Sequence, residues 1–439
     1  MSALPQRSRW GGLIVATALV LPTFAVRAEG LVQIGGHVAL FDSAHRLLPW
    51  APWTDVLERE MRQYARCPDD HGYPRFVVAT FLDGRCQPLA ARSDSIPATQ
   101  DGLGIISYLK YYDFTGQQSA AFLNAARAMG DYLLREALTP DSGTYPRFPR
   151  STGHADAFPQ PENSGTQSDQ PYEIQPDKGG IAGYALLQLF AVTHEPAYRD
   201  LSLHIARVLA ANQTPGNATQ SPWPFRADYR YGTARGPISS NMTFILRLYD
   251  ALLADGFGEF VAPRRALWHW IKDYQIPSAA TDGARFVQFF EDHDKDGNRN
   301  AWAPLTLARY LLEKREVLDP DWRADSGSLV EFVRRTFTHQ EFGVTVCHEQ
   351  DEDQEAWGGV NSTYGAVLAL YAKATGSATL AAEAHEVLNF VLYAVDEDGR
   401  AGDLIKNHGG GGWQEDAHTD VIHNYVDTLR AYPEWGTAR

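Results

Sequence analysis

Cysteine is scarce in this sequence, which contains three cysteines among 439 residues. Three cysteines allow one disulfide bridge and leave one thiol unpaired. Cys67 and Cys86 flank a segment rich in glycine and proline, so we expect them to form the bridge, which would add about 3 kcal/mol of stability on a chain-entropy estimate. Cys347 would then be the unpaired thiol, and we interpret it as a buried structural residue rather than a nucleophile.

Long apolar runs are absent after the N-terminal region, which excludes a membrane-spanning helix of about 20 apolar residues there. The one apolar stretch, residues 11–24, is too short to span a membrane, follows Arg7 and Arg9, and precedes small residues. This order is typical of a secretory signal peptide. We therefore expect residues 1–28 to be a signal peptide, residues 29–439 to form a single domain without membrane insertion, and the protein to be secreted or periplasmic.

Positive charge is also scarce, since 39 lysines and arginines stand against 54 aspartates and glutamates and the net charge is -15. This balance argues against nucleic acid and against an anionic membrane surface as partners. It does not exclude a polyanionic substrate, because a local basic cleft or a bridging cation can outweigh the net charge. Two motifs are absent as well: there is no G-x-S-x-G nucleophile motif, and the glycine run 409–412 lacks the Lys-Ser/Thr of a phosphate-binding loop.

What the sequence does contain is an imperfectly repeated helical unit, of which residues 221–256 are one complete example. An aromatic and proline-rich turn leads into a polar loop, and a helix is predicted to start at Pro237. Its apolar residues Phe244, Ile245, Leu248 and Leu252 recur with the period of a half-buried helix. Similar hairpins of two helices begin near residues 102, 180, 303 and 359, so five hairpins are predicted.

Two predicted helices, residues 53–66 and 418–432, have no hairpin partner in the sequence. If they pair with each other, the five hairpins become six and a ring of twelve helices closes. In such a ring each repeat buries its apolar face only against its neighbours. We therefore predict an all-α fold, an (α/α)6 toroid of helical hairpins in which the N-terminal and C-terminal helices close the ring.

The inner helices of such a toroid point their N-termini toward one face, so the loops that lead into them converge there together with the positive ends of the helix dipoles. The polar and aromatic residues at these helix starts are therefore our candidates for a functional site. They are Asp94, Gln100, Asp101, Asp177, Lys178, Arg235, Ser239, Asn241, Asn298, Asn300, Trp302, Glu355, Trp357, Asn361, Trp413, Glu415, Asp416, His418, Asp420 and His423.

Carboxylates mixed with aromatic side chains are typical of carbohydrate-active enzymes, in which aromatic faces stack on sugars and carboxylates act as acid and base. We predict that the catalytic carboxylates are among Asp101, Asp177, Asp416 and Asp420, with His418 as a proton shuttle or substrate contact. The alternative for such an aspartate is a helix N-cap, and for such a tryptophan a place in the core. Substrate contacts are predicted for Trp223, Tyr229, Asn241, Trp302, Trp357, Asn361 and Trp413.

The sequence is also compatible with a second reaction, β-elimination on a uronic-acid polymer. It needs a base and a group that neutralises the substrate carboxylate. Tyr231 and Arg235, with Tyr229, Arg230 and Asn241 nearby, provide such a set within one repeat unit. The third possibility is a toroid that binds glycans without catalysis.

Residues 292–300 have oxygen-bearing side chains with the spacing of an EF-hand calcium loop, and a glycine stands at the sharp turn. The match ends at the twelfth position, where Ala303 replaces the bidentate glutamate. A solvated acidic turn is the alternative. No cofactor is required for the predicted chemistry, so calcium is the only metal expected here, with Asp292, Asp294, Asp296, Asn298 and Asn300 as its ligands.

The hairpin series resembles the six-hairpin glycosidase superfamily over most of the chain. That resemblance implies an α/α toroid that acts on carbohydrates. The segment 221–256, with its aromatic turn, basic loop and asparagine at the helix start, resembles the toroid-type pectate lyases, which implies β-elimination. We predict an exported enzyme that cleaves the glycosidic bonds of a polysaccharide or oligosaccharide by carboxylate acid/base hydrolysis, with a polysaccharide lyase as the alternative.

Overall fold

The computed structural model describes residues 32–64, 73, 81–83, 86–87, 94–154, 169–288, 297–402, 405, 413–414 and 416–437. The chain from Gln33 to Arg439 forms one compact unit, and its architecture is the one given below. The predicted signal peptide, Cys67, Glu415 and three of the predicted calcium ligands lie outside the described residues. The signal peptide and the bridge between Cys67 and Cys86 therefore stay predictions.

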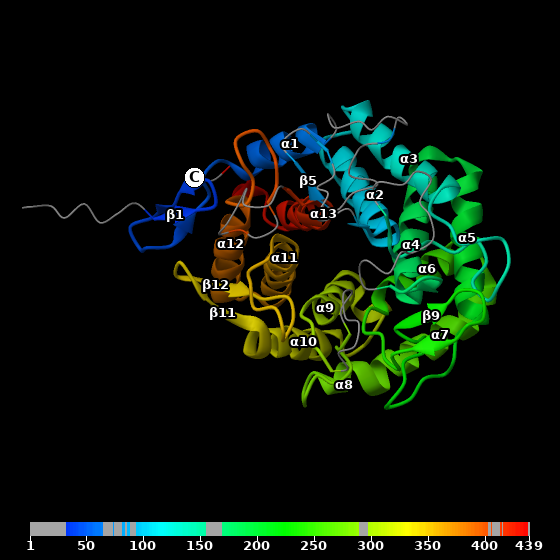
Figure 1. The fold of residues 1–439 in the computed structure, drawn as a ribbon. Helices are drawn as coiled ribbons and strands as arrows, with labels where there is room; N and C mark the ends of the chain where they lie inside the picture. Colours follow the sequence, from blue (N-terminus) through cyan, green and yellow to red (C-terminus); the bar gives the residue numbers. More distant parts are fainter. Residues whose placement is uncertain are drawn as a thin grey trace, which may run out of the picture. The chain divides into compact units, whose positions relative to one another are not determined.

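Figure 1 shows an inner ring of helices around a central axis, with outer helices beside them. Within the described residues the inner ring has six helices and the outer ring has six. The inner helices are α2 (Pro97–Phe114), α4 (Pro176–Thr193), α6 (Thr243–Ala254), α9 (Trp302–Lys314), α11 (Gly358–Thr375) and α13 (Asp416–Ala431). The outer helices are α1 (Trp53–Tyr64), α3 (Ala120–Arg135), α5 (Pro196–Ala211), α7 (Val261–Trp270), α10 (Trp322–Phe337) and α12 (Ala378–Leu392). The predicted all-α toroid is therefore confirmed.

The inner and outer helices differ in how their residues are buried. The inner helix α4 is apolar on all sides and buries nearly every residue of its first three turns, as expected for a helix surrounded by other helices. The outer helix α1 buries one face, with Trp53, Leu57 and Met61, and exposes charged residues on the other. Glycine lets the inner helices approach closely, because a Cβ atom at Gly180 would lie 2.7 Å from the amide nitrogen of Ile245 on α6.

The first and last helices close the ring as predicted. Trp53 on α1 donates its indole N–H to Oδ1 of Asn389 on α12 at 2.8 Å, and the Asn389 amide donates to the Leu47 carbonyl oxygen at 2.9 Å. On α13, Tyr425 packs edge to face against the Trp53 ring, with centroids 5.1 Å apart. Apolar packing and buried hydrogen bonds therefore join the two ends of the described chain.

Short elements connect these helices. The strands are β1 (Gln33–Ile34), β2 (His37–Val38), β3 (Leu40–Phe41), β4 (Leu47–Leu48), β5 (Phe81–Leu82), β6 (Asp94–Ser95), β7 (Gly153–His154), β8 (Glu173–Ile174), β9 (Arg226–Asp228), β10 (Ala234–Arg235), β11 (Thr338–Glu341), β12 (Val344–Cys347) and β13 (Trp413–Gln414). Short helical segments are η3 (Gly258–Phe260), η4 (Ile271–Gln275), α8 (Ile276–Ser278), η5 (Arg315–Val317) and η7 (Pro433–Gly436).

The strands form small antiparallel sheets, several of which lie immediately before inner helices. The three-stranded sheet β10-β9-β8 joins the segments that lead into α4 and α6, with Glu173 opposite Asp228 and Ala234 opposite Ala227. Strand β6, which leads into α2, pairs with β7, and β13, which leads into α13, pairs with β5. Within the described part, no helix combines the length and the apolar character needed to cross a bilayer.

Two helix starts differ from the prediction by about five residues. The first is α2, which begins at Pro97 rather than near residue 102. The second is α6. The sequence places it at Pro237, whereas α6 begins at Thr243. The backbone amide of Ser239 donates to Oγ of Ser221 at 2.8 Å, and the Pro237 carbonyl oxygen accepts from the Ser221 amide at 3.0 Å. These groups bond to the preceding turn instead of to a helix, so residues 237–242 form the loop before α6.

Candidate functional site

The first turns of the inner helices, with the residues just before them, form one end of the toroid, which we call the rim. A Cβ atom at Gly102 on α2 would lie 3.2 Å from the amide nitrogen of Ala182 on α4. On the other side of α2, a Cβ atom at Gly104 would lie 3.2 Å from a methyl carbon of Thr419 on α13. These close approaches place the predicted residues Asp101, Asp177 and Asp420 on adjoining helices at the same end of the ring.

Several buried polar side chains at the rim have no hydrogen-bond partner. Asp101 and Asp177 are fully buried, Asn241 is 2% exposed, and the side-chain oxygen and nitrogen atoms of all three accept or donate no hydrogen bond among the described residues. The same holds for the hydroxyl of Ser239 and the indole N–H of Trp357. Each unpaired buried group costs about 1–3 kcal/mol, so a cluster of them calls for a ligand or another function.

The two buried aspartates differ in their surroundings. Burial raises the pKa of Asp101 well above its ordinary value of 3.8, because the charged carboxylate is poorly solvated there. Asp177 instead lies beside a cation, with its Oδ2 atom 3.6 Å from Nζ of Lys178. Such a difference between neighbouring carboxyl groups is typical of acid/base pairs in enzymes.

A buried polar network holds the segment that leads into α4. The Asp169 carboxylate accepts hydrogen bonds from Nε of Arg226 at 2.8 Å, from Nε2 of Gln175 at 2.9 Å and from Oγ1 of Thr152 at 3.0 Å. The hydroxyl of Ser151 donates to the same carboxylate. Because Gln175 directly precedes α4, this network positions the first turn that carries Asp177.

Trp302 is the predicted aromatic contact that is best placed for a ligand. It begins α9 and stacks on Phe244 of α6, with ring centroids 6.0 Å apart and planes 15° apart. Nζ of Lys178 lies 5.8 Å from the Trp302 ring centroid. Trp302 therefore connects the rim to the cavity that follows along the axis.

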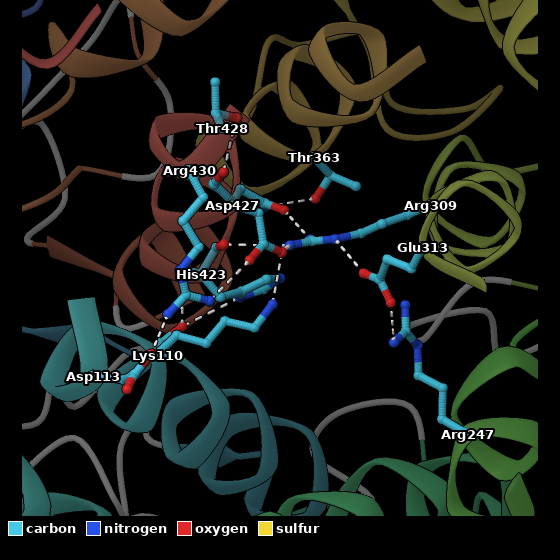
Figure 2. A network of polar contacts seen from close by, with 12 residues as sticks. Lys110, Asp113, Arg247, Arg309, Glu313, Thr363, His423, Asp427, Thr428 and Arg430 are labelled. Atoms are coloured by element: carbon cyan, nitrogen blue, oxygen red, sulfur yellow. Dashed lines mark hydrogen bonds and ion pairs between the residues drawn. The ribbon is translucent and has the colours of Figure 1, made fainter. Parts of the chain in front are cut away.

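That cavity has a volume of about 650 Å³ and is lined by side chains of all six inner helices. Tyr184, Phe244 and Trp302 supply aromatic walls, and charged residues farther along the axis form the network in Figure 2. We call it the axial cavity. Ligand-binding pockets commonly have volumes of about 300–1,000 Å³, so the axial cavity has the size of a small-molecule site.

The sequence did not single out the charged residues of the axial cavity, because they lie in the middle of helices. One feature of the sequence could nevertheless have indicated these charged residues. Lys110, Arg247 and Arg309 each follow a run of mostly apolar residues within an inner helix that is largely buried. A charge in such a helix must face either a partner or a cavity, since burial without either is costly.

Three predicted substrate contacts are corrected by the structure. Trp223 is fully buried and donates its indole N–H to the Leu209 carbonyl oxygen at 3.0 Å, and Tyr229 is 3% exposed. The Asn361 side chain accepts from the Cys347 amide and donates to the Cys347 carbonyl oxygen, both at 2.8 Å. These side chains are enclosed by the fold, and none of them lines the large cavity described above. Cys347 is buried, as expected of a structural thiol.

His418 is also corrected, because it is a buried structural residue. Its Nδ1 lies 3.2 Å from Oε1 of Glu60, its Nε2 lies 3.2 Å from the hydroxyl of Tyr108, and its ring stacks on Tyr64 at a centroid distance of 3.7 Å. Burial lowers the pKa of His418 to about 3. A neutral and enclosed imidazole cannot shuttle protons to a substrate at neutral pH.

The residues proposed for β-elimination are not brought together. Tyr231 lies in the turn between β9 and β10 and is 75% exposed. Arg235 on β10 forms an ion pair with Glu173 on β8, with an Nη1 to Oε1 distance of 3.3 Å. Neither residue occupies the desolvated position that a catalytic base or a carboxylate-neutralising group requires.

The remaining predictions concern residues that the structure describes only in part. Asn300 caps α9, since its Oδ1 accepts the Ala303 amide at 2.9 Å, and Oδ1 of Asn298 accepts the Glu352 amide at 3.3 Å. Within the described residues no three acidic, histidine or cysteine side chains are arranged to hold a metal ion. Because three of the five predicted calcium ligands lie outside the described residues, calcium binding stays a prediction. Outside the description lie Asp292, Asp294, Asp296, Glu415 and the side chains of Asp94, Trp413 and Asp416.

Comparison with known proteins gives matches at the level of structure. No protein-family model and no curated protein sequence matches the chain. A cellobiose 2-epimerase from Spirochaeta thermophila matches with a TM-score of 0.65 at 12% identity, over 87% of this chain and 95% of that one. A D-mannose isomerase matches with a TM-score of 0.65 at 12% identity, over 86% and 96%.

A family 76 glycoside hydrolase from a bovine Bacteroides thetaiotaomicron strain matches with a TM-score of 0.58 at 8% identity, over 90% of this chain and 84% of that one. This chain shares its fold with these proteins, so the α/α toroid that the sequence resemblance implied is confirmed. At such low identity the likeness concerns the fold alone.

Proposed function

We propose that this protein is a carbohydrate-active enzyme that hydrolyses glycosidic bonds of a polysaccharide or oligosaccharide. The observation that carries the proposal is the buried Asp101 carboxyl group, which has no hydrogen-bond partner among the described residues and whose pKa is raised by burial. It lies at the same end of the ring as Asp177 and Asp420. The structural neighbours named above act on sugars, which supports a carbohydrate as the substrate.

Glycoside hydrolysis needs one protonated carboxyl group and one ionised carboxylate on either side of the scissile bond. Asp101 is suited to be the acid, because burial raises the pKa of its carboxyl group and so favours the protonated form. Asp177, held in an ion pair with Lys178, is suited to be the carboxylate, and Asp420 is the alternative. Trp302 would stack on a sugar ring, and Asn241 would donate and accept hydrogen bonds to its hydroxyl groups.

The proposal favours hydrolysis over elimination because of Tyr231. A tyrosine base has to be close to its substrate and shielded from water, whereas the Tyr231 side chain is 75% exposed. The sequence-based case for a lyase depended on Tyr231 and Arg235, and Arg235 is engaged with Glu173. The acidic rim, by contrast, matches the requirement for paired carboxyl groups.

The test is a digestion of neutral and uronic-acid glycans by the purified protein, with three readouts. Hydrolysis releases reducing ends without ultraviolet absorbance, elimination produces the absorbance of an unsaturated uronate, and epimerisation changes sugar composition without new reducing ends. We expect the first outcome. Either of the other two would refute the proposal.

Variants connect the reaction to the rim. Asp101→Asn keeps the shape of the side chain but cannot release a proton, so turnover should fall by about 10²–10⁴-fold, the usual contribution of acid/base catalysis. Asp200→Asn on the outer helix α5, whose side chain is 63% exposed, is the matched control and should keep full activity. Full activity of Asp101→Asn on a hydrolysed glycan would show that the acid is elsewhere.

Export is part of the proposal and concerns residues outside the described part. The residues 1–28 should be removed during secretion. Cell fractionation with mass spectrometry of the mature N-terminus checks this, and deletion of residues 1–28 should leave the protein in the cytoplasm. A cytoplasmic protein with an intact N-terminus would contradict export without touching the catalytic proposal.

A further inference from the structure

The axial cavity contains a network of ion pairs that the proposed hydrolysis does not use. In Figure 2, Lys110 from α2 and Arg309 from α9 point toward Asp427 on α13, and Arg247 from α6 points toward Glu313 on α9. Nζ of Lys110 lies 2.6 Å from Oδ2 of Asp427, and Nη1 of Arg247 lies 2.6 Å from Oε2 of Glu313.

Arg309 connects the two halves of this network. Its guanidinium group contacts Asp427 and lies 3.3 Å from Oε1 of Glu313. At the outer end of the cavity, Arg430 pairs with Asp113 at 2.6 Å. The Arg309 side chain is 5% exposed and that of Arg247 is 11% exposed, so these charges are held in a confined space.

The charges that line the axial cavity do not balance. Among the described residues, its cations are Lys110, Arg247, Arg309 and Arg430, and its carboxylates are Asp113, Glu313 and Asp427. His423 also lines the cavity, and burial together with the nearby Arg309 and Lys110 lowers its pKa well below the ordinary value, so it is neutral. One positive charge therefore has no counterpart, although the chain as a whole is strongly acidic.

The excess charge is concentrated around Lys110. Burial lowers its pKa well below the ordinary value, and Arg309, Arg247 and Arg430 lower it further by repulsion. The Lys110 side chain keeps 28% of its surface exposed, and it lines the cavity. A bound anion would relieve this repulsion and would stabilise the charged ammonium group.

The walls of the cavity indicate what kind of anion fits. Tyr112, Tyr184, Phe244 and Trp302 present aromatic rings, which pack well against the faces of sugar rings. A phosphate monoester carries a charge of about −1.5 to −2 at neutral pH, whereas a carboxylate carries the single charge that the cavity lacks. The volume of about 650 Å³ accommodates a sugar ring with its substituents.

We propose that the axial cavity is a binding site for a sugar acid, whose carboxylate is held by Lys110 with Arg247 and Arg309 and whose ring lies against the aromatic walls. This site is separate in its chemistry from the acidic rim. Its occupation does not depend on hydrolysis, so binding can be measured whether or not the proposed reaction takes place.

The test measures binding of D-glucuronate to the full mature chain by calorimetry, with D-glucose and inorganic phosphate as comparison ligands. We expect glucuronate to bind, glucose to bind at least about tenfold more weakly because it makes no charge-assisted hydrogen bond, and phosphate to bind more weakly than glucuronate. Equal binding of glucose, tighter binding of phosphate, or no binding of glucuronate would overturn the proposal.

Variants of one residue locate the site. Lys110→Gln removes the excess charge and should weaken glucuronate binding by about tenfold or more, whereas Lys110→Arg keeps the charge and should retain binding. Lys373→Gln on the surface of α11 is the matched control and should bind like the wild type. Unchanged binding by Lys110→Gln would refute the site.

A second variant covers the case in which Lys110→Gln does not fold. Arg430 lies at the outer end of the cavity with a side chain that is 43% exposed, and its partner Asp113 is 65% exposed. Arg430→Gln therefore removes one positive charge at the outer end and, besides the pair with Asp113, loses only a long contact of 4.0 Å with Asp427, while the pairs of Asp427 with Lys110 and Arg309 remain. It should also weaken glucuronate binding, and unchanged binding would again refute the charge argument.

Discussion

Replacing Asp101 with asparagine should stabilise the protein and inactivate it at the same time. Asp101 is fully buried near the start of α2, and its carboxyl oxygens accept no hydrogen bond among the described residues. The substitution keeps the size of the side chain and removes the proton equilibrium. Natural proteins keep such unfavourable groups where function needs them.

The size of the effect follows from the raised pKa of Asp101. Below pH 3.8 the carboxyl group is protonated in the folded and the unfolded chain, so it does not make stability depend on pH. Above pH 3.8 the unfolded chain releases the proton and the folded chain retains it until the raised pKa is reached. In that window this group lowers the free energy of unfolding by about 1.4 kcal/mol per pH unit, and asparagine does not.

The assay is urea unfolding of wild type and Asp101→Asn at several pH values from 4 to 7. The variant should gain stability relative to the wild type as the pH rises. Asp200→Asn, on the surface of α5, should show no such pH-dependent gain. A constant difference between Asp101→Asn and wild type across this range would refute the reasoning, because it would mean that burial does not raise the pKa of Asp101.

Three further predictions concern the groups around the rim. Asp169→Asn removes the carboxylate that pairs with the buried Arg226 and should lower the free energy of unfolding by about 3–5 kcal/mol in denaturant. Asp141→Asn breaks only the exposed pair with Arg147 and should lower it by less than about 1 kcal/mol. Equal losses would contradict the role of burial. Burial lowers the pKa of His418 from 6.5 to about 3, so its contribution to stability is complete above pH 6.5 and is lost by about 1.4 kcal/mol per pH unit as the pH falls toward 3. In unfolding curves His418→Asn should therefore lose less stability than the wild type between pH 7 and pH 5. An unchanged loss would contradict the assignment. Tyr231→Phe should keep wild-type turnover on a cleaved glycan, because Tyr231 is exposed, and a loss of nearly all turnover would support β-elimination instead.

The position of most helices could be predicted from the sequence because helical periodicity is local. The apolar residues of α6 and the glycines near the starts of α4 and α11 each lie within one short segment, so the pattern is visible in the sequence. The error at Pro237 has an equally local cause, since Ser221 bonds to the backbone there. Predictions failed where the burial and the hydrogen-bond partners of a side chain depend on residues far away in the sequence. His418 is an example, because its partner Glu60 belongs to the first helix.

The sequence by itself determined the toroid, because a series of hairpins with one apolar face each has to bury these faces against neighbours, and two unpaired helices close the ring. It also placed Asp177 and Asp416 at the starts of inner helices. Only the tertiary structure decided which of these residues are left unpaired, as Asp101 is, and that Lys110, Arg309 and Asp427 meet on the axis. Burial and charge balance depend on contacts between residues that are far apart in the chain, so they cannot be predicted from a local sequence pattern.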